Sequence, residues 1–255
     1  MKDRKHSQVT PKSKGQPTCP PDRTRRYILK LSGEALGGPD GSGINQDVLR
    51  DVSNQVLEVY EGGFDLAIVV GAGNIFRGLQ GAAQGMDRVQ ADQMGMLATV
   101  INAMALHDAL RSNGIAARVM SAIHVSEVVE PYSPERAIRH LEKNVVILAG
   151  GTGNPYFTTD TAAALRAVEM QADCVLKATK VDGVYDKDPI EHPDAKRYSS
   201  VTFDQCLTDR IGVMDATAFA LCRENNMPVR VFSMTTPGSL QRVCAGEDIG
   251  TLVTP

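Results

Sequence analysis

The sequence predicts an α/β protein: a three-layer αβα sandwich in which helices cover both faces of a mostly parallel central sheet. From Arg26 to the end of the chain, apolar segments of strand length alternate with helical patterns. These segments are continuous runs of Val, Ile and Leu, which are typical of parallel strands buried on both faces. Strands that alternate with helices along a chain favour a parallel sheet between two helix layers.

Each expected strand is a short apolar run. The seven expected strands lie at residues 26–32, 65–71, 116–122, 144–150, 173–179, 229–233 and 251–254. The expected helices lie near residues 45–61, 88–113, 133–142, 159–171, 203–209, 215–226 and 237–245. The first helix has clear ends, because Asn45 is a good N-cap and Gly62-Gly63 is a good stop. We find no internal repeat or long linker, so we expect a single domain over residues 26–255.

The first 25 residues differ from the rest in composition. They are rich in Lys, Arg and Pro and almost free of apolar side chains, whereas the remainder of the chain is acidic. Such a segment buries too little apolar surface to order itself, which predicts a disordered basic tail over residues 1–25. The alternative is a nucleic-acid-binding arm. The acidic body disfavours it, so we expect no nucleic-acid partner.

Cysteine usage and hydropathy exclude several classes of protein. The five cysteines are scattered and form no CxxC pair, which argues against a disulfide framework or a zinc site and fits a reducing compartment. The longest apolar runs are well short of the ~18 residues needed to cross a bilayer. The N-terminus has no apolar signal core. We therefore expect a cytoplasmic protein with no membrane partner and no metal site of its own.

Ligands of parallel sheets bind beyond the carboxyl ends of the strands, so the loops that follow the strands are the candidate site. The first loop, KLSGEALGG, begins at Lys30 and offers an ammonium group beside a glycine turn. The second, VVGAGNIFRG, carries glycines and Arg77 and suits a phosphate. It is neither a P-loop nor a complete dinucleotide fingerprint. Either loop alone is weak evidence, because an ordinary turn explains it too.

The third loop, GTGNPYFTTD, spans residues 151–160 and opens the helix TAAALRAVEM. Its glycines permit close backbone approach, and its threonines and Asp160 stand at the positive end of that helix. Helix capping explains any single one of these residues but not the whole run. The fourth loop, LKATKVDGVYDKDP, can place a ring and backbone groups against an adenine while its lysines face phosphates. Its Asp182-Gly183 pair also fits a hairpin turn. The methionines of DQMGMLATVINAMAL have helical spacing and are expected to pack.

Taken together, KLSGEAL, GAGNIFRG, DQMGMLAT, GTGNPYFTTD, KATKVDGVYDKDP and RIGVMDATAFAL resemble, in this order, the bacterial uridylate kinases (UMP kinases) of the amino-acid kinase superfold. The resemblance covers roughly residues 26–254. It implies transfer of the γ-phosphoryl group of ATP to UMP with Mg²⁺ as cofactor. It also implies a homohexamer that is activated by GTP and inhibited by UTP.

The resemblance assigns roles to individual residues. The catalytic residues would be Lys30, Arg77 and Asp160. The ATP-binding residues would be Lys30, Leu31, Ser32, Gly33, Gly73, Arg77, Thr179, Tyr185 and Asp188. The UMP-binding residues would be Ala72, Asp92, Thr152, Gly153, Asn154, Pro155, Tyr156, Phe157, Thr158 and Thr159. The segment that matches the one linked to GTP activation would be Gly38, Pro39, Asp40, Gly41, Ser42 and Gly43. Asp160 would orient a lysine, and Asp215 would either support the site or only cap a helix.

Three functions remain open at this point. The first is UMP kinase. The second is another kinase of the superfold, acting on acetylglutamate, carbamate or aspartate; Asp92 and the GTGNPYFTT run argue instead for a nucleotide acceptor. The third is a non-catalytic binding or storage protein that has lost transfer, against which the retention of Lys30, Arg77 and Asp160 argues. Because a UMP phosphate is already ionised at neutral pH, the reaction needs positioning and charge neutralisation rather than a general base.

Overall fold

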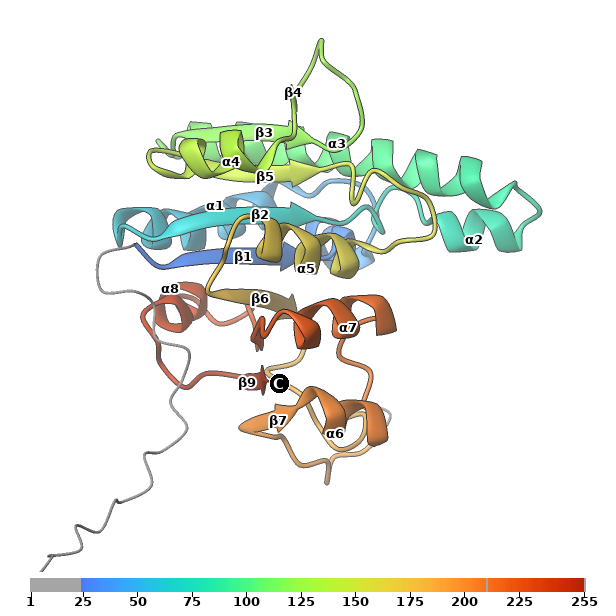
Figure 1. Cartoon of the computed structure of the whole chain (residues 1–255), viewed down its shortest axis with the longest axis vertical. Helices are drawn as coiled ribbons and strands as arrows, with labels where there is room; N and C mark the ends of the chain where they lie inside the picture. Colours follow the sequence, from blue (N-terminus) through green and yellow to red (C-terminus); the bar gives the residue numbers. More distant parts are fainter. Residues whose placement is uncertain (1–23, 210, 255) are drawn as a thin grey trace, which may run out of the picture.

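The structure is a computed structural model in which residues 24–209 and 211–254 are described. A nine-stranded sheet runs through this part of the chain in the order β4-β3-β5-β2-β1-β6-β8-β9-β7 (Figure 1). The strands are β1 (Arg26–Leu31), β2 (Asp65–Val70), β3 (Ala117–Ser121), β4 (Glu130–Pro131), β5 (Val145–Ala149), β6 (Cys174–Thr179), β7 (Ser200–Thr202), β8 (Val229–Ser233) and β9 (Thr251–Thr254). All paired strands are parallel except β8 and β9. The mostly parallel α/β sheet is therefore confirmed. The predicted tail lies outside the described residues except for residues 24 and 25.

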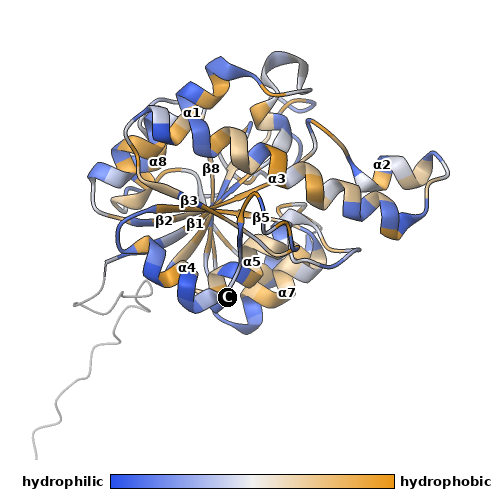
Figure 2. Ribbon diagram, turned by 90° about the horizontal axis from the view of Figure 1, so that it is seen from above, coloured by the Kyte–Doolittle hydropathy of each residue, from blue (hydrophilic) through white to orange (hydrophobic). Residues whose placement is uncertain are grey.

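Helices cover both faces of the sheet (Figure 2). One layer contains α1 (Gln46–Glu61), α3 (Arg88–Ser112) and α8 (Ser239–Cys244), and the other contains α4 (Pro134–Leu141), α5 (Thr159–Glu169) and α7 (Ala216–Glu224). The short helix α6 (Phe203–Thr208) contacts α7 through the edge-to-face rings of Phe203 and Phe219, whose centroids are 5.5 Å apart. This arrangement is the predicted three-layer sandwich.

Strand β1 shows why the apolar runs are continuous. Tyr27, Leu29 and Leu31 pack in the core beneath α1 and α3, whereas Ile28 packs in the core beneath α5. Alternate side chains of a strand point to opposite faces, so a strand buried on both faces needs apolar residues at every position. Helix α1 is buried on one side only, and its core residues recur with helical spacing at Leu49, Val52, Val56 and Val59.

Helix α3 has 25 residues and two different apolar faces. Its inner face is buried and includes Met96 and Leu106. A second stripe, which we call the α3 stripe, consists of side chains that are 42–51% exposed: Met94, Leu97, Ile101 and Met104. Of the three methionines expected to pack, Met96 is buried in the core, whereas Met94 and Met104 belong to the α3 stripe. No helix in the described ranges is both long enough and apolar enough to cross a membrane.

Besides the 3₁₀ turns Gly33–Leu36 and Gly38–Asp40, three elements of the described residues are additional to those predicted. They are the two-residue strand β4, the three-residue strand β7 and the short helix α2 (Gly78–Ala83). Each is too short for periodicity to show in the sequence. Helix α2 lies beside the beginning of α3 and projects beyond the sheet (Figure 1). The antiparallel direction of β9 relative to β8 was not predicted either, because an apolar run does not reveal whether a strand pairs parallel or antiparallel.

Four parallel strands lie side by side in the order β5, β2, β1, β6, and each is followed by a predicted ligand loop. Because parallel neighbours end at the same edge of a sheet, the four loops come together at the carboxyl edge. The sheet thereby places Lys30, Gly71, Gly150 and Thr179 around a common region. This region is the candidate site.

Candidate active site

A carboxylate lies between two lysines at the centre of the site. Lys30 on β1 is 3.0 Å from one carboxylate oxygen of Asp160, and Lys177 on β6 donates a 2.6 Å hydrogen bond to the other. All three side chains are at most 14% exposed. Burial alone would raise the pKa of Asp160, but the two ammonium groups outweigh it and lower that pKa below its usual value. The cluster therefore holds two cations and one anion, which leaves a net positive charge facing the loops.

Lys177 was not among the residues assigned from the sequence, although it lies within the quoted KATKVDG motif. Its ammonium group also donates to the carbonyl oxygen of Val213. Burial lowers the pKa of Lys177, and the opposing attraction of Asp160 raises it only in part. Lys177 is the residue of β6 that pairs in register with Lys30 of β1. A lysine in each of two expected strands was the feature of the sequence that could have identified it. Asp160 therefore contacts two lysines, Lys30 and Lys177, where one was expected.

Asp215 caps a helix and also contacts residues at the end of the third loop. Its carboxylate accepts from the backbone N–H of Ala218 and caps α7. The same carboxylate accepts from the hydroxyl groups of Thr158 and of Thr161, the latter at 3.0 Å. Thr158 in turn caps α5. Asp215 therefore connects the end of the third loop to the start of α7.

The first two loops touch each other through glycines. A Cβ atom added to Gly33 would lie 2.4 Å from the backbone nitrogen of Gly73 and 2.5 Å from the side-chain oxygen of Asn74. A Cβ atom at Gly71 would lie 2.8 Å from the backbone nitrogen of Gly33. Only glycine permits two backbones to approach this closely. Residues 32–33 and 71–73 therefore pack backbone to backbone next to Lys30, and the N–H of Gly71 is bonded to the carbonyl of Leu31.

Gly33→Ala is expected to reduce turnover at least tenfold. The new methyl group must separate the two loops, and a displacement of ~1 Å in a positioned site can lower the rate by about 10²-fold. Steady-state turnover at saturating substrates measures the effect. Gly95→Ala on α3 is the matched control, because its Cβ atom would lie 3.9 Å from its nearest neighbour. Equal activity of the two variants would contradict the proposed contact between the loops.

The third loop follows β5 in an unusual backbone conformation. Gly150, Gly151 and Gly153 all have positive φ, at 76°, 58° and 84°. Tyr156 has φ of 71°, which is strained for a residue with a side chain. Its backbone N–H donates a 2.7 Å hydrogen bond to Asp92, which stabilises the turn. Such strain is typical of ligand-binding loops, and it is consistent with the predicted role of residues 152–159.

Asp92 joins the third loop to α3. Besides Tyr156, its carboxylate accepts a 2.8 Å hydrogen bond from Arg88, whose guanidinium lies 5.1 Å from the centroid of the Tyr156 ring. Tyr156 and Phe157 are 64% and 49% exposed. Ala72, by contrast, is buried at the end of β2. The structure thus brings Asp92 together with the predicted acceptor loop, and the assignment of both to UMP stays a prediction.

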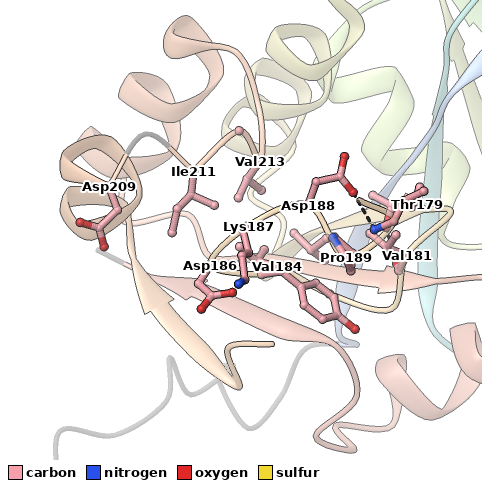
Figure 3. Close-up of a pocket in the computed structure, with 15 residues that line it drawn as sticks. Thr179, Val181, Val184, Asp186, Lys187, Asp188, Pro189, Asp209, Ile211 and Val213 are labelled. Atoms are coloured by element: carbon pink, nitrogen blue, oxygen red, sulfur yellow. Dashed lines mark hydrogen bonds between the residues drawn. The ribbon is translucent and has the colours of Figure 1, made fainter. Parts of the chain in front are cut away.

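The fourth loop borders a cavity of about 460 Å³ (Figure 3). Thr179, Tyr185 and Asp188, the three residues assigned to the ATP nucleoside, all line it. Apolar walls come from Val184, Val213 and Val231. The carbonyl of Val213 accepts from Lys177, so the cavity adjoins the charged cluster directly. A cavity of this size with one apolar wall and several polar groups suits a nucleoside.

The remaining predicted residues lie in the first and second loops and in the segment 38–43. Leu31 ends β1, and Ser32, the next residue, caps the 3₁₀ turn Gly33–Leu36. Arg77 forms an ion pair with Glu34 at the mouth of the second loop, close to Gly73. Within residues 38–43, glycines 38, 41 and 43 have positive φ, and the backbone N–H of Gly43 donates to the carbonyl of Asn74. The described residues contain no group of three or more His, Cys, Asp or Glu side chains that could hold a metal ion.

Comparison with known proteins agrees with this geometry. Residues 25–233 match the amino acid kinase family. The solved structure of UMP kinase from Bacillus anthracis is 40% identical and covers 91% of this chain and 97% of its own, with a TM-score of 0.87. UMP kinase from Ureaplasma parvum is 39% identical over 91% of this chain and 100% of its own, with a TM-score of 0.85.

A more distant structure has the same fold. Uridylate kinase from Archaeoglobus fulgidus is 26% identical, covers 89% of this chain and 99% of its own, and superimposes with a TM-score of 0.67. The family match spans the first, second, third and fourth loops and most of the sheet. The chain therefore belongs to the amino acid kinase family.

Proposed function

We propose that the chain is a UMP kinase, which transfers the γ-phosphoryl group of ATP to UMP and forms UDP and ADP in pyrimidine nucleotide biosynthesis. One observation carries the proposal: the Lys30–Asp160–Lys177 cluster adjoins both the third loop, which is bonded to Asp92 of α3, and the cavity lined by Thr179. An acceptor and a donor nucleotide bound at these two places would meet at the cluster. The similarity to UMP kinases at about 40% identity supports the same function.

The geometry supports phosphoryl transfer without a general base. The acceptor oxygen belongs to a phosphate that is already ionised, so no proton has to be removed before attack. Lys30 and Lys177 supply positive charge next to the transferred group, and Asp160 holds their ammonium groups apart and in place. The backbone N–H groups of Ser32, Gly33, Ala72 and Gly73 would add donors that need no reorganisation during the reaction.

Mg²⁺ would enter as part of the donor substrate, as the MgATP complex. The described residues provide lysines and N–H groups at the cluster rather than several carboxylates, so the phosphates would supply most of the metal's ligands. The ion would neutralise charge on the β- and γ-phosphates. Lys30, Ser32, Gly33, Gly73 and Arg77 would hold those phosphates on the protein side.

UMP is expected to be the preferred acceptor, with dUMP and CMP poorer. Asp92 is predicted to accept from the ribose hydroxyls, one of which dUMP lacks, and the Thr-rich run of residues 152–159 is predicted to surround the uracil, which CMP lacks. A buried carboxylate that loses such a hydroxyl partner costs about 1–3 kcal/mol. That energy corresponds to a preference of roughly 5- to 150-fold in kcat/KM. ADP release with a panel of nucleoside monophosphates, acetylglutamate, carbamate and aspartate measures it. Equal efficiency with UMP and CMP, or transfer to acetylglutamate, carbamate or aspartate in place of UMP, would refute the proposed function.

Asp92→Asn tests the residue behind this preference. The variant should narrow the gap between UMP and dUMP, because an amide accepts hydrogen bonds less strongly than a carboxylate. Asp108→Asn, at an exposed position on the same helix, is the matched control and should keep the wild-type ratio. If the ratio of kcat/KM for UMP to that for dUMP is unchanged in Asp92→Asn, Asp92 does not bind the ribose.

The finer properties implied by the family are also proposals for this chain. The α3 stripe supports self-association, and we propose the homohexamer on that basis, because exposed apolar rows of this kind are commonly covered by a partner. GTP is proposed as an activator that acts through residues 38–43, which contact the second loop. UTP is proposed as an inhibitor, ATP as the donor, and residues 26–255 as one kinase domain located in the cytoplasm.

A further inference from the structure

Two buried asparagines pair with each other next to the phosphate loops. Asn74 lies in the second loop and is 6% exposed, and Asn102 lies on α3 and is fully buried. The Asn102 amide donates a 2.7 Å hydrogen bond to the side-chain oxygen of Asn74, and the Asn74 amide donates a 3.0 Å bond in return. Buried polar side chains are expensive unless they are fully hydrogen-bonded. The pair is therefore a specific structure rather than a packing accident.

The remaining amide hydrogens of the pair bind backbone carbonyls of two different segments. Asn102 donates a 2.8 Å hydrogen bond to the carbonyl of Gly71, and Asn74 donates to the carbonyl of Gly43. All four amide hydrogens are thus used. The side-chain oxygen of Asn74 also faces Gly33, where a Cβ atom would lie 2.5 Å from it. The pair consequently touches the first loop, the second loop and the segment 38–43 at once.

Helix α3 is the rigid element behind these contacts. At Asp92 it holds the third loop through the N–H of Tyr156, and at Thr99 its hydroxyl oxygen accepts a 2.7 Å hydrogen bond from the N–H of Gly150. At Asn102 it holds the second loop. Three positions on one helix thus fix the acceptor loop and the phosphate loop relative to each other.

We propose that Asn102, acting through its amide pair with Asn74, is a positioning residue for phosphoryl transfer. It fixes the backbone of residues 71–74, against which Gly33 packs, so that the N–H groups of both loops face the transferred group beside Lys30. This inference rests on the proposed kinase function. It adds a residue that touches neither nucleotide but sets the geometry of the groups that do.

Two substitutions at residue 102 test the proposal. Asn102→Leu keeps the approximate volume and removes all hydrogen bonding, so turnover should fall roughly 10- to 100-fold, in line with a misplacement of about 1 Å or less. KM for UMP should change by a smaller factor than turnover, because Ala72 is the only predicted UMP contact that lies in residues 71–74, whereas Asp92 and residues 152–159 lie outside them. Asn102→Asp at pH 8 should show a similar loss, since an ionised carboxylate has no hydrogen to donate to Gly71.

The pH profile separates positioning from loss of packing. A fully buried carboxyl group has a raised pKa, and when protonated it regains one donor. The ratio of wild-type to Asn102→Asp turnover should therefore shrink at least fivefold between pH 8 and pH 6, whereas the ratio for Asn102→Leu stays constant. Asn113→Asp, at the exposed C-terminal end of α3, is the matched control and should follow the wild type at both values.

Each outcome decides the matter. Near-wild-type turnover of Asn102→Leu would show that only an introduced charge does harm, and it would overturn the proposal. So would an Asn102→Asp ratio that is flat with pH, or a loss confined to KM for UMP. If Asn102→Asp does not fold, Asn74→Asp takes the same test, and failure of both to fold would make the pair a folding requirement and refute the positioning role. Absence of UMP phosphorylation by the wild type would refute the proposed function instead.

Discussion

Replacing Lys30 with alanine is expected to lower turnover by roughly 10²- to 10³-fold, the usual effect of removing one preorganised electrostatic donor. Lys30 stands at the carboxyl end of β1, 3.0 Å from Asp160 and beside the packed backbones of residues 32–33 and 71–73. Charge on the phosphoryl group redistributes as it moves between nucleotides. A fixed ammonium group at that position contributes more in the transition state than in the ground state.

UMP affinity should change only a few-fold in the same variant. Most of the predicted UMP contacts are Asp92 and residues 152–159, and Lys30 is not among them. Turnover at saturating substrates and UMP binding by calorimetry measure the two effects separately. Lys30→Met retains the buried stem of the side chain and should lose as much turnover as Lys30→Ala, while Lys143→Ala, at an exposed position, should behave as wild type.

A different pattern would change the assignment of roles. If UMP binding collapses while turnover at saturating UMP stays near the wild-type value, Lys30 is an acceptor-binding residue. If Lys30→Met retains activity and Lys30→Ala does not, the stem rather than the charge is what matters. Either pattern would transfer the electrostatic role to Lys177, the second ammonium group of the cluster.

Asp160→Asn is expected to affect both turnover and stability. The change leaves two largely buried ammonium groups without their carboxylate, and removing one partner of a buried pair costs about 3–5 kcal/mol. Turnover should fall by roughly 10²-fold or more, because both lysines lose the group that orients them. Urea denaturation measures the stability, and Asp248→Asn is the control, since its carboxylate pairs with Arg230 but is 77% exposed.

The stability loss should depend on pH with a defined sign. In the wild type the pKa of Asp160 is lowered, so its contribution is present above the unfolded carboxyl pKa of about 4 and is lost only as the pH falls through the lower folded value. In the variant, burial lowers the pKa of Lys177 without the opposing carboxylate. The unfolded chain then binds more protons than the folded chain, so the stability of the variant should rise from pH 6 to pH 9. A loss that grows with pH would contradict the arrangement.

Local patterns in the sequence determined most of the fold and the position of the site. The apolar runs of β1, β2, β5 and β6 could be recognised in the sequence, because strands buried on both faces need apolar residues at most positions. Parallel neighbours end at one edge, so the loops after Ser32, Val70, Ala149 and Thr179 were recognisable as one site before any contact was known. Glycines and Asn45 marked turns and a helix start for reasons that are equally local.

The tertiary structure decided the partners across the site. Asp160 pairs with two lysines rather than one, and Asp215 binds Thr158 as well as capping α7, because those groups meet only when β6 and α7 are packed against α5. In the sequence, nothing distinguishes Asn102 from other polar residues of a long helix. In the structure, its side-chain nitrogen lies 2.7 Å from the side-chain oxygen of Asn74. The Asn102–Asn74 and Thr158–Asp215 contacts join residues that are 28 and 57 positions apart, and periodicity along the chain carries no information about such pairs.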